Sequence, residues 1–404
     1  MTLAKSKRSY SQNTIIWLCW FAYTLAYLGR YSYNANINLI IRDFETSYAD
    51  AGLVTTFFFF SYGIGQVVNG ILCKKYNKKF IFPFVLFASS VLNLLIITLP
   101  FSSFKYIWML NGFLQSCLWS SIIHVLGTNL DAEHMEKALT LMSVTATIGT
   151  IFSYGSSAFF VWLGNYHFSF IFAALMMSAL GLCWILLFQD NPIYSRPVEE
   201  QKQTQKKISG VGIVLGALAL FAVIDNLVKD GVNTWMPTLL AENFGMKNES
   251  SILSTIILPL LGTLGALISV KLNRIIKDFV SLILVLLVVA SGFLCFILFF
   301  ENTNAVIMVV CCGILMCMMH AVNNVITSIA PLKMRDKVEP GKTAGILNGF
   351  CYLGSTLSAY GLGAIADRSG WDAVFYLLLS ACGIGLLVGL LYAAYRSISR
   401  RKVA

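Results

Sequence analysis

Long apolar runs, separated by short polar segments, follow one another along almost the whole chain. A helix needs about 20 mostly apolar residues to cross ~30 Å of hydrocarbon. The runs reach that length twelve times, so we predict an all-α membrane protein. Several runs are longer, which indicates tilted or curved helices around a central cavity. The predicted spans are residues 13–37, 49–73, 80–100, 105–127, 137–163, 167–188, 209–240, 250–272, 279–299, 304–331, 343–366 and 371–395.

One long polar segment, QDNPIYSRPVEEQKQTQKKIS, interrupts this series between the sixth and seventh spans. It is rich in charge, Gln and Pro and cannot bury a core. We therefore predict a six-helix half at 1–188, a cytoplasmic linker at 189–208 and a second six-helix half at 209–404. A basic loop follows the second span of each half, KKYNKK and KLNRIIKD, as expected of a repeat transporter with its substrate site between the halves.

Composition and charge agree with a protein that has lipid as its solvent. Of the 404 residues, 57% are hydrophobic and 12% are charged, with a mean hydropathy of +0.73. The net charge of +10 comes from Lys and Arg concentrated in alternate loops, which predicts cytoplasmic termini in a multi-pass cell-membrane protein. The charge is therefore explained by topology, and we expect no nucleic-acid partner.

Several functional classes are disfavoured by missing motifs. The ten cysteines show no CxxC pair and no metal spacing, so neither a disulfide framework nor a metal site is expected. The sequence has no Walker A motif, nucleophile elbow or HExxH motif, which argues against an ATPase or a membrane hydrolase. We expect no cofactor and no enzymatic activity, and a monomer whose partners are membrane lipid and a small anion.

Two cations fall inside predicted spans. Arg30 lies in the first span, and Lys229 lies at the corresponding place in the first span of the second half. A charge within hydrocarbon is costly, so it should face a cavity or a partner, and a guanidinium suits carboxylate or phosphate. An anion held by both residues is one interpretation. Neutralisation of Lys229 by Asp225, four residues earlier, is the other.

Other polar residues in the spans have two interpretations each. Asp225 is a candidate proton carrier or a structural partner of Lys229. His124 and His320 are candidates for titration or for hydrogen-bonded packing, and Asn323 and Asn324 for substrate binding or for joining helices. Aromatic side chains with a polar tip are further candidates to line the cavity, alongside a role in packing. These are Tyr23, Tyr27, Tyr62, Trp119 and Tyr352.

The sequence resembles the organophosphate:phosphate antiporter family of the major facilitator superfamily. The resemblance rests on AYLGRYSYNANI, SYGIGQVVNG, NGFLQSCLW, KDGVNTWMPTLL and KTAGILNGFCYLGS, in this order. It implies the twelve-helix major facilitator fold. It also implies that Arg30 and Lys229 bind a phosphate group, with Tyr23, Tyr27 and Tyr62 nearby. Other cations of the family are replaced here by Tyr31, Gln66, His124 and a residue near Ala146.

The expected function is transport of a small organic anion, such as a sugar phosphate or glycerol phosphate, by alternating access. Coupling by exchange for phosphate and coupling to protons both stay open. An alternative is a proton symporter of a neutral or zwitterionic solute that uses Asp225. A sensor that binds without transporting is a third class, disfavoured because no large cytoplasmic output segment is visible.

Overall fold

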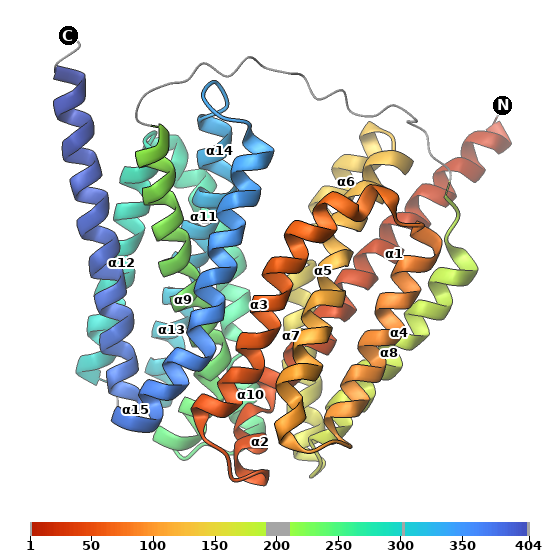
Figure 1. Cartoon of the computed structure of the whole chain (residues 1–404), viewed down its shortest axis with the longest axis horizontal. Coiled ribbons are helices and arrows are strands. Elements are labelled where there is room, and N and C mark those ends of the chain that lie inside the picture. Colours follow the sequence, from red (N-terminus) through yellow and green to blue (C-terminus); the bar gives the residue numbers. More distant parts are fainter. Residues whose placement is uncertain (1, 191–210, 301–303, 402–404) are drawn as a thin grey trace. The chain divides into compact units, whose positions relative to one another are not determined.

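The computed structural model describes residues 2–190, 211–300 and 304–401, and the described regular structure is helical. The prediction of an all-α protein is confirmed (Figure 1). The α-helices are α1 Thr2–Ala35, α2 Ile37–Asp43, α3 Tyr48–Leu72, α4 Lys78–Ile96, α5 Phe104–Asn129, α6 Ala132–Met142, α7 Thr145–Trp162, α8 His167–Leu187, α9 Val211–Asn243, α10 Asn248–Ser254, α11 Ile257–Ile275, α12 Phe279–Phe300, α13 Ala305–Asn324, α14 Ala330–Lys333 and α15 Pro340–Arg401.

Within the described ranges, ten helical segments are long and apolar enough to cross a membrane. The last of them, Gly341–Arg396, contains both final predicted spans. Inside it the backbone leaves helical geometry at Gly370, whose φ of 79° lies in the left-handed region that favours glycine. The first predicted span lies in α1, which is outside the ten, so the predicted number of twelve fits the structure.

Three predicted spans contain breaks that the apolar pattern did not show. The span at 137–163 divides into α6 and α7, where the Ser143 and Thr145 hydroxyls donate to backbone carbonyls and compete with the helix. The span at 250–272 divides into α10 and α11, which places Pro259 in the first turn of α11, where no backbone N–H is needed. The span at 304–331 passes through a π-helical turn at Val325–Ile329 before α14.

The chain forms two compact units, of residues 1–39 with 57–202 and of residues 40–56 with 203–404. Helix α3 thus begins in the second unit and ends in the first. The predicted half boundaries stay a prediction, and the predicted linker at 189–208 lies almost entirely outside the described residues.

In the first unit, α1 packs along α7 and α8, and α4 packs along α8 (Figure 1). An aromatic stack fixes α4 against α8. The Trp184 ring lies between Phe82 at 3.9 Å and Phe188 at 4.8 Å, measured between ring centroids, and its indole N–H donates to the Lys78 carbonyl at 3.1 Å. The indole is thereby buried with its one donor satisfied.

In the second unit, α9 packs along α15, and α11 along α13. Glycines permit both approaches. A Cβ at Gly354 would collide with the Val223 carbonyl oxygen, and a Cβ at Gly265 would collide with the Cys317 carbonyl oxygen. Close backbone approach at small residues is a common way to pack helices in a membrane. These contacts hold α9 and α13, which bear the polar candidates of this unit, in fixed positions.

We predict that Gly149→Ala destabilises the protein, because a Cβ at this position of α7 would lie 2.5 Å from both the Thr24 carbonyl oxygen and the Tyr27 Cβ of α1. Overpacking of this kind costs about 1–3 kcal/mol, so the melting temperature of the purified protein should fall by several degrees. Gly127→Ala is the matched control, because nothing lies within 4 Å of a Cβ at Gly127. Equal melting temperatures for the two variants would contradict the prediction.

Candidate functional site

The first unit buries Arg30 near the C-terminal end of α1, with 5% of the residue exposed. The guanidinium Nε donates to Oε1 of Gln115 in α5 at 3.3 Å. The Gln115 amide in turn donates to Oδ1 of Asn111, one turn earlier on α5, at 3.1 Å. A chain of neutral amides therefore orients the guanidinium and replaces part of its lost hydration.

Aromatic rings surround the same guanidinium. The Arg30 Cζ lies 4.4 Å from the ring centroids of Tyr27 and Tyr62, and 5.0 Å from that of Phe58. These are cation–π distances, and such contacts are stronger where water is excluded. The predicted proximity of Tyr27 and Tyr62 to Arg30 is thus present in the structure.

A column of aromatic rings continues from Arg30 along α1. The Tyr23 ring lies 5.2 Å from Tyr27 and 4.8 Å from Trp119 of α5, and Tyr27 lies 5.7 Å from Tyr31. Ring faces with polar edges of this kind suit the C–H and hydroxyl groups of a polyhydroxy compound. His124 of α5 is half-buried, and among the described residues its side chain makes no ring contact or hydrogen bond with this cluster.

The second unit buries Asp225 of α9 completely. Its Oδ2 accepts hydrogen bonds from the Asn323 amide of α13 at 3.0 Å and from the Asn226 amide at 3.2 Å. Its Oδ1 has no donor among the described residues. The Asn323 amide also lies 3.6 Å from the Cys351 sulfur of α15, so three helices meet at this carboxyl group.

Lys229 lies one turn further along α9 and is half-buried. Its charge interacts with the Asp225 carboxyl and with His320. Asp230, beside it, accepts a hydrogen bond from the Ser355 hydroxyl of α15. The structure thus brings Asp225, Lys229, Asn323 and His320 of the predicted set into one region of the second unit.

Three candidates of this unit also make contacts that belong to helix structure and packing. The His320 ring packs over Gly262, where a Cβ would collide with the imidazole. The Asn324 amide donates to the Ser269 hydroxyl at 2.8 Å, which joins α13 to α11 and agrees with the structural interpretation of Asn324. Tyr352 is half-buried on α15, where its carbonyl accepts from the Thr356 hydroxyl at 2.8 Å.

A polar cluster at the N-terminus of α3 was not predicted from the sequence. Both oxygens of the Asp367 carboxylate accept from the first amides of α3, Tyr48 N–H at 2.9 Å and Ala49 N–H at 2.8 Å. The Tyr48 hydroxyl and the Trp371 indole, at 3.3 Å, both donate to the Glu242 carboxylate. All these groups belong to the second unit. Glu242 and Asp367 lie shortly after predicted spans, but the sequence carries no signal of the groups with which they pair.

Comparison with known proteins identifies this arrangement. The model of the Major Facilitator Superfamily matches residues 19–338, and the chain belongs to this superfamily. It therefore has the major facilitator fold and is a multi-pass membrane transporter. A crystal structure of a bacterial homolog to the human lysosomal transporter Spinster, inward-facing and occupied, superposes with a TM-score of 0.74 at 15% identity, covering 98% of this chain and 97% of that one.

The sequence relatives include a protein named as a membrane sensor and two that are named for phosphorylated compounds. The membrane sensor protein UhpC of Escherichia coli (strain K12) is 23% identical and covers 94% of this chain and 91% of its own. The glycerol-3-phosphate transporter of Bacillus subtilis (strain 168) is 22% identical, with 90% and 89% covered. The human sugar phosphate exchanger 3 is 23% identical, with 87% and 82% covered. The predicted resemblance to organophosphate:phosphate antiporters is confirmed.

We predict that Asp367→Ala destabilises the protein by about 1–2 kcal/mol, because the first two amides of α3 lose their acceptor. Chemical denaturation in detergent, followed by tryptophan fluorescence, would measure the change. Asp372→Ala is the control. Asp372 is an exposed carboxylate of α15, the helix that also carries Asp367, and it makes no hydrogen bond among the described residues. An unchanged unfolding midpoint for Asp367→Ala would show that water replaces the acceptor at no cost.

Proposed function

We propose that this protein transports a small phosphorylated organic anion, such as a sugar phosphate or glycerol phosphate, by alternating access. The observation that carries the proposal is the buried Arg30 guanidinium, which neutral amides orient and aromatic rings cover. A guanidinium in such surroundings binds a phosphate dianion strongly, because little water competes and the fork geometry matches two phosphate oxygens.

The aromatic column supports an organic rather than an inorganic anion. A phosphate ester bound at Arg30 would place its carbon skeleton next to Tyr23, Tyr27 and Trp119, whose rings lie in contact with one another. Ring faces gain free energy from covering C–H groups, which inorganic phosphate lacks. We propose that Lys229 also contacts the substrate during the transport cycle, with His124, His320, Asn323, Asn324 and Tyr352 as further candidates.

The first test is thermal stabilisation of the purified protein by glucose 6-phosphate and glycerol 3-phosphate, with glucose, glycerol and inorganic phosphate as comparisons. A ligand that binds only the folded state raises the melting temperature. We predict that Arg30→Ala weakens phosphate-ester binding at least about tenfold, because a lost charged hydrogen bond costs about 1.5–3 kcal/mol. Lys229→Ala should also weaken it.

Arg368→Ala and Lys247→Ala are the matched controls, because both residues are basic and have no described partner. Uncharged sugars that stabilise the protein as well as their phosphates would overturn the proposed substrate class. Counterflow of labelled ester into proteoliposomes then separates a transporter from a sensor. Binding without counterflow would favour a sensor function. The relative UhpC is named as a membrane sensor protein.

A second candidate is proton-coupled symport through Asp225, with a neutral or zwitterionic solute as an alternative substrate. It is favoured by the complete burial of this carboxyl group and by an Oδ1 that has no donor among the described residues. A protonated carboxyl group would add a donor of its own. The titratable groups that interact with this carboxyl are Lys229 and Asp230 on α9 and the thiols of Cys351 and Cys382 on α15, and His320 of α13 interacts with Lys229.

For this candidate we predict that Asp225→Asn abolishes the uptake driven by a pH gradient but leaves counterflow within about twofold of the wild type. Asparagine keeps the size and the acceptor oxygen but cannot exchange a proton. The measurement is uptake into proteoliposomes with and without an inside-alkaline gradient, with Asp225→Glu as the conservative variant. Gradient-driven uptake that survives in Asp225→Asn would show that Asp225 has a structural role.

A further inference from the structure

A cavity of about 590 Å³ lies in the second unit, and neither Arg30 nor Asp225 belongs to its lining. It is formed by the connection between α11 and α12 and by the last turns of the span that ends at Arg396. Its polar lining consists of Lys277, Asp278, Ser281, Tyr392 and Arg396. Because one candidate span begins and another ends here, we infer that the cavity lies at the level of the lipid headgroups.

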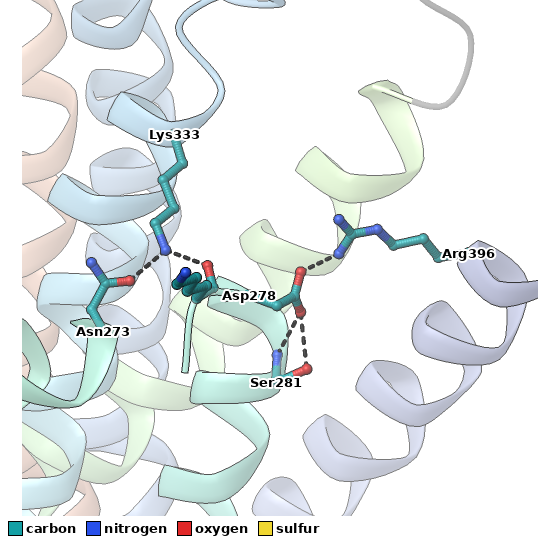
Figure 2. A network of polar contacts seen from close by, with 6 residues as sticks. Asn273, Asp278, Ser281, Lys333 and Arg396 are labelled. Carbon is teal, nitrogen blue, oxygen red and sulfur yellow. Dashed lines mark hydrogen bonds and ion pairs between the residues drawn. The ribbon is translucent and has the colours of Figure 1, made fainter. Parts of the chain in front are cut away.

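Asp278 organises this cavity (Figure 2). Its Oδ2 accepts from the Ser281 backbone N–H and hydroxyl, both at 3.0 Å, and its Oδ1 pairs with the Arg396 guanidinium. Partial burial raises the pKa of Asp278, but the hydrogen bonds from Ser281 and Arg396 outweigh it and lower the pKa below its ordinary value. The carboxylate therefore stays ionised and holds Arg396 in place.

Two cationic side chains of the lining, Lys277 and Arg396, have N–H groups that can donate to a ligand. Among the described residues, the Arg396 guanidinium is bonded to Asp278 alone. It has five N–H groups, and 38% of the side chain is exposed, so several N–H groups can reach a ligand. The exposed ammonium of Lys277 has no partner among the described residues. Lys333 donates to the Asn273 side chain and to the Lys277 carbonyl, which fixes the backbone that carries Lys277 (Figure 2). Two cations against one paired carboxylate leave the lining positive.

Apolar surface continues from the cavity along both spans. On α12, Val285 and Val288 follow Ser281 at helical spacing and are 44% and 58% exposed. On α15, a stripe of exposed side chains runs alongside Tyr392 and Arg396. It consists of Ile384, Leu387, Leu391 and Tyr395. A ligand with an anionic head and apolar chains therefore fits this face better than a free anion does.

We propose that this cavity binds the headgroup of an anionic phospholipid, with the phosphate between Lys277 and Arg396 and the acyl chains against the apolar surface of α12 and α15. Basic pockets at the cytoplasmic ends of transmembrane helices suit such headgroups, and the predicted topology puts this end of both spans in the cytoplasm. The bound lipid would brace α12 against α15 at their ends.

Native mass spectrometry with short-chain phosphatidylglycerol tests the proposal, with phosphatidylcholine and inorganic phosphate as the other arms. We predict retained phosphatidylglycerol on the wild type and an apparent affinity about fivefold lower for each cation removed. The variants are Lys277→Ala and the double variant Asp278→Asn/Arg396→Gln, which removes both charges of the pair together. Lys271→Ala is the matched control, an exposed lysine of α11 outside the cavity lining.

Three outcomes would overturn the proposal. Equal retention of phosphatidylcholine and phosphatidylglycerol would show that the site does not select for an anionic headgroup. An equal loss of affinity in Lys271→Ala and Lys277→Ala would indicate a general surface-charge effect. Displacement of the lipid by inorganic phosphate would indicate a site for a free anion. Because Lys277 is exposed and unpartnered among described residues, Lys277→Ala should fold, and its melting temperature without lipid checks this.

Discussion

The cost of placing charge in hydrocarbon governs the polar architecture of both units. Arg30 and Asp225 each lie in a helix that crosses a low-dielectric region, where an unsolvated charge costs several kcal/mol. Each is therefore surrounded by groups that replace water. For Arg30 these are the Gln115 amide and the faces of Tyr27, Tyr62 and Phe58. For Asp225 they are two asparagine amides. Neutral hydrogen-bond partners and π-faces solvate a charge without cancelling it, so the charge keeps its attraction for a ligand or a proton.

Such a shell requires helices held at fixed distances, which explains the glycines and the helix breaks. Gly149 lets α7 approach α1 beside Tyr27, and Gly262 and Gly265 let α13 approach α11 beneath His320. The π-helical turn at Val325–Ile329 follows Asn323 and Asn324 directly. Single π-helical turns inside α-helices are frequent at functional sites. The π-helical turn of the second unit thus lies close to its polar centre.

The sequence predicted most of the fold and the identity of the central charges, because apolar length and intramembrane charge are local signals. Arg30, Tyr27 and Tyr62 were expected together, and the structure places them in contact. Partners across helices have no local signal. Gln115 is 85 residues from Arg30, and nothing in NGFLQSCLW marks it as a hydrogen-bond acceptor. The same holds for Asp367, which caps a helix more than 300 residues earlier. The helix breaks depend on single hydroxyls and prolines that a hydropathy window averages away.

The two polar centres differ in a way that bears on coupling. Around Arg30, the described neighbours include an amide and three aromatic rings. Around Asp225, the neighbours include the ionisable groups Lys229 and Asp230, and His320 interacts with Lys229. On the proposed assignment, the first unit binds the anion and the second unit carries the proton. Exchange for phosphate needs only the first of these properties, whereas symport needs both, and retention of a buried carboxyl group costs stability that exchange alone would not require.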